Sequence, residues 1–427
     1  MKRIACRGVL MVGLDVHSNA FGREDMVINA RNRVSRCVLL VLAFAAVAWL
    51  VLYACCPGSE QKGLFFCGGE ANHFYDYFVP RAVARMQSPY VQDTYSDMVD
   101  LRCVRRIVQC YPALSNYWVG LFPESLNGAV LCSSIGAVVF LFGTIAFFRR
   151  HLPESVFVAT ALACTSAPFV FAVTVGNLIL YAAGFTLLFL AWFDSSSRWQ
   201  RCVAAIALAL ATALKVTPAL LGVLYLGRNA RDRIGYVALA AVAALFFLMV
   251  PFLFCGGFFA WLENASMMNN SSEFTSMNCV GLYGLVTMLV RSFTMSFLPS
   301  GWERLLHLLS SCIGVTLLVS GCLSRGDSWE RGAAVTLGMM FVPPTMMIYT
   351  SLYLIPLAIT GMYRSDSRLR LASAVYCIFS CMLLRIPLFL GPPSSLNICF
   401  AAAASVDLAF WLSCLTIGRL LRGKQCV

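Results

Sequence analysis

The chain alternates long apolar runs with short polar turns, most of which are basic. An α-helix needs about 20 consecutive apolar residues to cross the hydrocarbon core of a bilayer, and several runs reach that length. The pattern therefore predicts an all-α polytopic membrane protein. The apolar runs cover residues 38–56, 128–148, 154–172, 178–194, 201–226, 234–254, 306–323, 332–362, 371–389 and 398–417.

Composition and charge support this interpretation. Hydrophobic residues make up 59% of the 427 residues and charged residues 12%, and the mean hydropathy is +0.76, which excludes an ordinary soluble domain. The net charge of +12 would suit nucleic-acid binding only if the basic residues gathered on one soluble face. They lie instead in the turns between apolar runs, which the positive-inside rule assigns to the cytoplasm.

Charge parity predicts that two of the runs enter the membrane and return. If residues 201–226 crossed once, the basic turn at Arg228, Arg231 and Arg233 would face outward, against the rule. Pro218 supplies a break, because proline lacks the N–H and clashes with the preceding turn. The run 332–362 is expected to break in the same way at "VPPT", residues 342–345. We therefore expect about twelve membrane segments in a bundle with broken or re-entrant helices.

The same layout divides the chain into regions. The first apolar run follows a long polar segment and is long enough to span, so it predicts an anchor helix rather than a cleavable signal peptide. The large first loop is expected to be extracytoplasmic, where Cys67, Cys103 and Cys110 are able to form disulfides, although spacing does not assign a pairing. The predicted regions are a cytoplasmic segment 1–37, the first transmembrane helix 38–56, the loop 57–126, the multi-span domain 127–418 and a cytoplasmic tail 419–427.

One further apolar stretch is not expected to cross. Counting "VGLYGLVTMLVRSF", residues 280–293, as a span would place Arg325 and Arg331 outside. We therefore expect it to be a helix that lies in the outer interface.

Lys215 stands near the middle of the apolar run 201–226. Cations inside a membrane are costly and usually face a cavity that holds a partner. Two interpretations stay open: Lys215 extends to the outer interface or pairs with a loop carboxylate, or it holds a phosphate together with helix-end groups freed at the break. Arg385, alone in "CMLLRIPLFLG", is either a second phosphate-binding cation or an ordinary interfacial arginine.

Five stretches in order carry a family resemblance. They are "HFYDYFVPRAVARMQSPY", "CYPALSNYWVGLFP", "GNLILYAAGFTLLFLAWF", "ALATALKVTPALLGVLYLGRNARDR" and "SMNCVGLYGLV". With these stretches the chain resembles the GT-C glycosyltransferases of the polyprenyl-phosphate-mannose-dependent α-mannosyltransferase type, family eighty-seven, over residues 38–362. The resemblance rests on order and spacing more than on any one signature.

The chain departs from the family pattern in two places. The acidic residue of the family commonly stands further before the Pro-Tyr pair than Asp76 stands before Pro89 and Tyr90, so Glu70 is the alternative base. Late in the chain, the family often has a Ser-Pro pair together with polar aromatic residues. This chain has "FVPPTMMIYTSLYLIPL" at that place, so contacts with the acceptor there are expected to differ.

The resemblance implies an enzyme, a polyprenyl-phosphate-sugar-dependent hexosyltransferase. Such an enzyme moves a hexose, most often mannose, from a lipid-linked donor to a lipid or glycan acceptor on the extracytoplasmic face of a bacterial plasma membrane. The donor is a substrate, so no cofactor is expected, and the partners are the donor, the acceptor and membrane lipids, with no nucleic acid. The alternative is a transporter or flippase of lipid-linked sugars, which would share broken helices and an intramembrane cation. No obvious twofold repeat supports that alternative.

The residues also suggest a mechanism. An acceptor hydroxyl loses a proton as it attacks, so a loop carboxylate is a sensible base, and we assign Asp76 because aromatic residues surround it. Lys215, with Arg385, would stabilise the departing phosphate. A single displacement inverts the anomeric configuration, and without an Asp-x-Asp pair we expect no metal site. Further candidate substrate contacts are His73, Asn177, Asn278 and His307.

Overall fold

The computed structural model describes most of the chain after residue 110. Within the described residues every regular element is a helix, so the all-α prediction is confirmed there. The described residues are 111–227, 230–255, 257–270, 281–294, 299–343, 348–365, 367–381 and 396–422, with residues 74, 76–78, 80 and scattered positions between 37 and 55. Glu70, His73, Asn278, Arg385, Cys67, Cys103 and Cys110 lie outside them.

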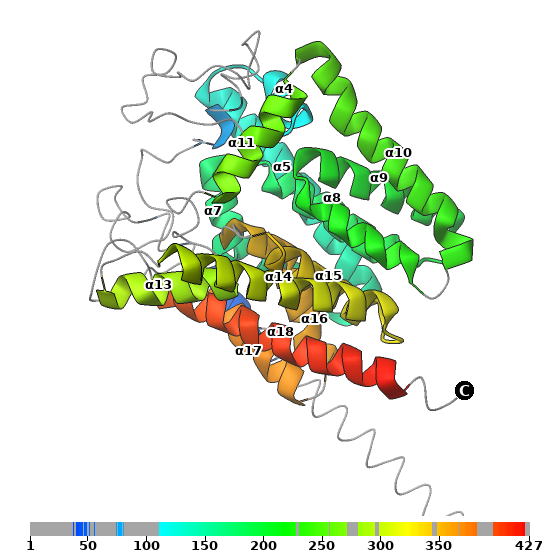
Figure 1. Cartoon of the computed structure of the whole chain (residues 1–427), viewed down its shortest axis with the longest axis vertical. Helices are drawn as coiled ribbons and strands as arrows, with labels where there is room; N and C mark the ends of the chain where they lie inside the picture. Colours follow the sequence, from blue (N-terminus) through cyan, green and yellow to red (C-terminus); the bar gives the residue numbers. More distant parts are fainter. Residues whose placement is uncertain are drawn as a thin grey trace, which may run out of the picture.

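The first group of helices is built around a close parallel pair, the helices Leu126–His151 and Ile179–Trp192. It contains α4 (Ala113–Gly120), α5 (Leu126–His151), η2 (Pro153–Ser155), α6 (Val156–Thr165), α7 (Ala167–Val175) and α8 (Ile179–Trp192) (Figure 1). Gly143 of α5 meets Gly184 of α8 so closely that a Cβ on Gly143 would lie 2.1 Å from the Gly184 carbonyl oxygen. Small residues allow helix backbones to approach in this way in membrane proteins.

The predicted span 154–172 is not one straight helix. Its two halves, α6 and α7, are bent by 52° at a break, where Ser166 has an extended backbone. Pro168 stands in the first turn of α7, where its missing N–H costs nothing. The correction has a local cause, because Ser166 and Pro168 start a new helix that the apolar pattern alone does not reveal.

The second group turns back on itself as charge parity predicts. It contains α9 (Arg198–Leu214), η3 (Thr217–Leu226), α10 (Ala230–Cys255) and α11 (Phe258–Asn270). The break falls at Lys215, just before Pro218. Near the end of η3, Tyr225 donates its hydroxyl to the carbonyl of Arg201, close to the start of α9, at 3.5 Å. The segment therefore returns to the end at which it began.

The third group contains another broken pair. Its elements are α13 (Leu282–Thr294), α14 (Ser300–Leu323), α15 (Ser328–Phe341), η4 (Ile348–Tyr353), α16 (Ile355–Arg364), α17 (Ser367–Cys381) and α18 (Leu396–Arg422). The helix α15 ends at the predicted "VPPT" stretch, and the chain resumes as η4. The helix predicted over 280–293 is present as α13, and its place in the interface stays a prediction.

Basic side chains from separate turns meet at one end of the bundle. Arg150 pairs with Asp194 at 2.7 Å, which joins the ends of α5 and α8. Arg331 donates to the carbonyls of Leu224 and Cys322 at 3.3 and 3.4 Å. These contacts bring together turns that the positive-inside rule assigns to one side. We call this end of the molecule the basic end.

Four described helices are long and apolar enough to cross a membrane, or five if the bent α6–α7 pair counts as one span. The prediction of about twelve segments is therefore not confirmed. The helix α8 has 14 residues and rises only about 21 Å, short of the roughly 30 Å core. The four spans are Leu126–His151, Ile234–Phe254, Gly301–Leu323 and Phe400–Leu421.

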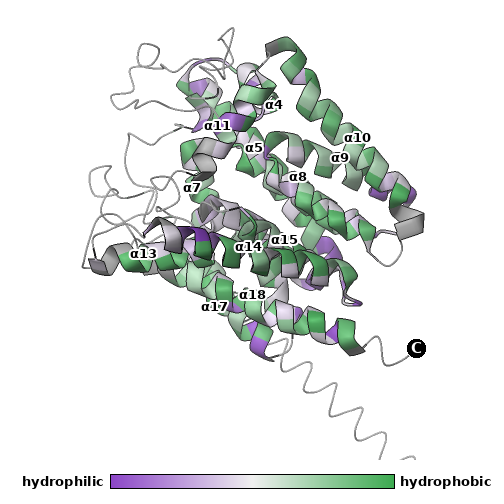
Figure 2. Cartoon of the chain, in the orientation of Figure 1, coloured by the Kyte–Doolittle hydropathy of each residue, from purple (hydrophilic) through white to green (hydrophobic). Residues whose placement is uncertain are grey.

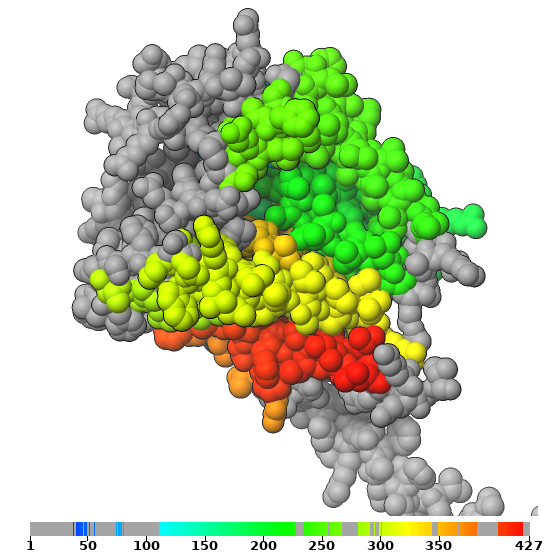
Figure 3. Space-filling view, viewed as in Figure 1, coloured from blue at the N-terminus to red at the C-terminus, as the bar shows by residue number. Residues whose placement is uncertain are grey.

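The outward faces of the long helices are apolar. In α10, Leu245 and Leu253 are exposed, as are Leu308 and Val319 in α14. Figure 2 shows hydrophobic residues along these helices, and Figure 3 shows α14 and α18 side by side, with α10 on the same face of the molecule. Apolar side chains on outward faces are what lipid contact requires.

Candidate functional site

The segment that carries Asp76 docks on the junction between α7 and α8. The backbone N–H of Phe74 donates to the Thr174 carbonyl at 2.8 Å, and the buried Tyr77 donates its hydroxyl to the Pro123 carbonyl at 2.6 Å. Gly176 ends α7 with a φ of +70°, and a Cβ there would lie 2.9 Å from the Tyr77 Cβ. Both the left-handed backbone and this close approach require glycine.

Asn177 fixes the carboxylate of Asp76. Its Nδ2 donates to Asp76 Oδ2 at 2.6 Å, and its Oδ1 accepts from the Ile179 N–H at 2.8 Å, at the first residue of α8. The second bond determines which way the amide faces, so the donor end points at Asp76. Nδ2 also lies 3.4 Å from the Tyr111 hydroxyl. The sequence assigns Asn177 to substrate, and that contact stays a prediction beside the positioning role.

Burial and charge act in opposite directions on Asp76. Its side chain is half-buried, and desolvation raises the pKa of the carboxyl above its ordinary value, while the Lys215 charge and the Asn177 hydrogen bond oppose that rise. A carboxylate with a raised pKa is a stronger proton acceptor once it is ionised. The net effect suits a general base.

Lys215 follows the last residue of α9 and lies against aromatic rings. Its Nζ is 4.3 Å from the ring centroid of Tyr111 and 5.7 Å from that of Tyr349. Aromatic faces attract cations through their quadrupoles. The side chain is half-buried, and its charge is near enough to Asp76 to lower the pKa of that carboxyl.

The helix end beside Lys215 corrects one expectation. The groups freed where α9 ends are carbonyls, and one of them, that of Leu214, accepts from Ser115 Oγ at 2.8 Å. Carbonyls and the negative end of the helix dipole attract a cation and repel a phosphate. At the end of α9, any affinity for a phosphate therefore comes from the ammonium group itself.

Sequence reasoning missed three aromatic residues at this place. Phe171 of α7 stacks on Tyr349 of η4, with ring centroids 6.1 Å apart and planes inclined by 16°, and Tyr111 lies between Asn177 and Lys215. Tyr111 belongs to one of the stretches that resemble the family, which was the available signal. The apolar pattern does not distinguish Phe171 and Tyr349 from core aromatics.

His307 lies in a different contact. Its ring centroid is 4.0 Å from that of Tyr283, and Tyr283 donates its hydroxyl to Glu303 at 3.0 Å. These residues join α13 to α14. The predicted substrate contact of His307 stays a prediction, as do those of Glu70, His73, Asn278 and Arg385, which the structure does not describe.

The residues that meet here form what we call the Asp76 site, and their chemistry suits sugar transfer. The site contains a fixed carboxylate, an ammonium group and stacked aromatic rings, supplied by Asp76, Tyr111, Phe171, Asn177, Lys215 and Tyr349. Two of the residues, Lys215 and Tyr349, come from places where membrane runs break. Convergence of broken helices exposes polar groups where a ligand needs them.

Comparison with known proteins identifies the family. The model described as glycosyltransferase family 87 matches residues 113–351, more than half of the chain. The matched region includes Asn177, Lys215 and Tyr349 and begins after Asp76 and Tyr111. No curated protein matches the chain. This chain therefore belongs to glycosyltransferase family 87.

Proposed function

We propose that this glycosyltransferase moves a hexose, mannose in the first instance, from a polyprenyl-phosphate donor to a lipid or glycan acceptor. The observation that carries the proposal is the meeting of Asp76 and Lys215 at one end of the bundle, joined through Asn177 and Tyr111. A base and a cation are the two groups that displacement of a lipid phosphate requires.

The proposed reaction is a single displacement. The acceptor hydroxyl oxygen attacks the anomeric carbon of the sugar, and the bond from that carbon to the phosphate oxygen breaks. Asp76 takes the hydroxyl proton, and polyprenyl phosphate leaves with the bonding electron pair, its added charge stabilised by Lys215. The configuration at the anomeric carbon inverts. The leaving group carries one phosphate, so a single cation is sufficient in this scheme and no metal is invoked.

The charge distribution supports an extracytoplasmic site. The helix α5 has 26 residues and is about 39 Å long. Its first turn lies near Tyr77, while its last turn carries Arg149, Arg150 and His151 at the basic end. If the basic end is cytoplasmic, the Asp76 site faces outward. For a bacterial plasma membrane that is the side on which we propose the transfer. The family match gives no support to the transporter alternative.

The proposal is tested by incubating the purified protein with polyprenyl-phosphate-mannose and a membrane-lipid extract, followed by mass spectrometry of the lipids. We expect a lipid heavier by one hexose, formed in the presence of a chelator and with inverted anomeric configuration by NMR. Polyprenyl-phosphate-glucose is the matched donor control. A product formed only from a nucleotide sugar, or one with retained configuration, would contradict the proposal.

A further inference from the structure

A cavity of about 210 Å³ lies at the basic end of the bundle, remote from the Asp76 site. The last turn of α5, the short helix η2 and the last turn of α16 form its walls. Pockets for drug-sized ligands usually occupy about 300–1,000 Å³. The cavity is therefore suited to a small polar group rather than to a whole substrate.

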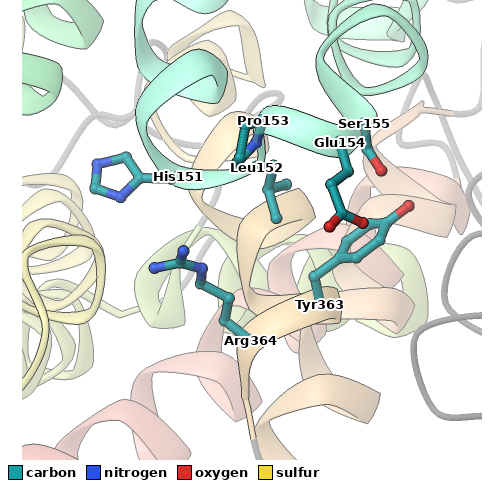
Figure 4. Close-up of a pocket in the computed structure, with 7 residues that line it drawn as sticks. All are labelled: His151, Leu152, Pro153, Glu154, Ser155, Tyr363 and Arg364. Atoms are coloured by element: carbon teal, nitrogen blue, oxygen red, sulfur yellow. The ribbon is translucent and has the colours of Figure 1, made fainter. Parts of the chain in front are cut away.

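The cavity has two chemically different sides. Figure 4 shows His151 and the Arg364 guanidinium toward one side, with the Glu154 carboxylate and the ring of Tyr363 toward the other. Arg364 is exposed, and the structure gives it no ion pair or hydrogen bond within the described residues. A guanidinium binds phosphate oxygens with two parallel hydrogen bonds. A carboxylate and an aromatic face both attract an ammonium group.

One buried polar atom in the wall has no bonding partner. His151 is 3% exposed, and its Nε2 makes no hydrogen bond within the described part of the chain. The ring of Phe147 packs against the His151 ring, with ring centroids 4.6 Å apart. Buried polar groups are normally satisfied, so such an atom points to a missing ligand or water.

The depth of the cavity suggests where its ligand comes from. His151 is the last residue of a helix that is long and apolar enough to span, so the cavity lies where that span reaches the polar boundary. Lipid phosphates lie at this boundary, and basic pockets at the ends of membrane helices bind lipid head groups.

We propose that this cavity binds the head group of phosphatidylethanolamine from the leaflet at the basic end. Arg364 holds the phosphate, and Glu154 with Tyr363 holds the ammonium. The carboxylate of Glu154 selects against phosphatidylglycerol, whose head group has no cation. The three methyl groups of phosphatidylcholine remove its N–H donors and disfavour it. This site is separate from sugar transfer and does not rest on the proposed reaction.

Native mass spectrometry of the purified, delipidated full chain tests the proposal with three phospholipids of matched acyl chains. We expect phosphatidylethanolamine to bind about tenfold more tightly than phosphatidylglycerol or phosphatidylcholine. Glu154→Gln should abolish the preference for phosphatidylethanolamine over phosphatidylglycerol. Arg364→Gln should weaken the binding of both of these lipids by about tenfold, with partial recovery in Arg364→Lys. The matched control is Arg368→Gln, because Arg368 lies over the Trp411 ring at 4.9 Å and does not line the cavity.

Free head groups separate a lipid site from a plain anion site. Phosphoethanolamine should displace the bound lipid at a concentration at which inorganic phosphate does not. Thermal unfolding of each variant in detergent confirms that it is folded, and Arg364→Lys remains informative if Arg364→Gln is not. Equal binding of all three lipids, equal displacement by inorganic phosphate, or unchanged binding in Glu154→Gln would overturn the proposal.

Discussion

Asn177 Nδ2 donates to Asp76 Oδ2 at 2.6 Å, across 101 positions of the chain. The same amide is anchored at its other end by the Ile179 N–H, so the first residue of α8 determines the position of the carboxylate. The bond also lowers the pKa of Asp76 against the larger effect of burial. Four predictions concern these residues and their neighbours, and a fifth concerns their side of the membrane.

The first prediction is that Asp76 acts as the base. Asp76→Asn keeps the shape of the side chain but removes the proton acceptor, so we expect turnover to fall about a hundredfold or more with little change in donor binding. Single-turnover assays with a lipid-linked sugar measure the first quantity, and donor-analogue titration the second. Asp194→Asn, which removes a carboxylate at the basic end, is the control. Undiminished activity, or a larger loss in Glu70→Gln, would move the role elsewhere.

The second prediction concerns pH. Burial raises the pKa of Asp76 above its ordinary value of 3.8, so kcat/KM should fall with decreasing pH through a limb that lies above 3.8. The Asn177 hydrogen bond favours the charged carboxylate, so its loss in Asn177→Ala should raise the pKa and move the limb to higher pH. The measurement is the pH dependence of kcat/KM for both proteins. A purely structural role predicts lower activity at every pH with the limb in the same place.

The third prediction tests Lys215. Lys215→Met keeps much of the apolar stem and removes the charge, so donor binding and transfer should weaken together, by about ten- to hundredfold for one charge-assisted contact. Lys215→Arg should recover part of the loss. If the lysine only extends to the interface, the Met variant binds the donor analogue as the wild type does. Thermal stability measured on both variants separates a binding defect from a folding defect.

The fourth prediction separates the two contacts of Tyr111. Tyr111→Phe keeps the ring against Lys215 and removes the hydroxyl near Asn177. We therefore expect its affinity for a donor analogue to fall by about threefold or less. Tyr111→Leu removes the ring as well and should weaken donor binding by about tenfold, because the cation–π contact is partly desolvated. Donor-analogue affinity is the readout. Equal affinities in the two variants would show that the ring has no part in holding the ammonium.

The fifth prediction concerns sidedness. Glu124 and Arg149 are both exposed and lie near opposite ends of α5. In a background without other accessible thiols, an impermeant thiol reagent added to intact cells should label the Glu124→Cys protein and spare the Arg149→Cys protein until the membrane is opened. Labelling of Arg149→Cys from outside would reverse the proposed orientation of the Asp76 site.

The sequence by itself determined the local features of the molecule. It predicted a break near Pro218 and a break at residues 342–345 within the run 332–362, and α9 and α15 end beside these two positions. Gly176 and Asn177, which end α7 and open α8, are local features of the same kind. These features depend on proline, glycine and short polar side chains, whose effects extend over a few residues. The bend at Ser166 has a local cause too, but a continuous apolar run concealed it.

Only the tertiary structure decided which residues meet. Asp76, Tyr111 and Asn177 are far apart in the chain, and their contacts arise because the docked segment, α4 and the α7–α8 junction pack together. Hydrophobic periodicity identifies the buried face of a helix but not the helix that covers it. For the same reason the aromatic partners of Lys215 could not be predicted: Tyr349 reaches it only because two distant membrane runs both break at this end of the bundle.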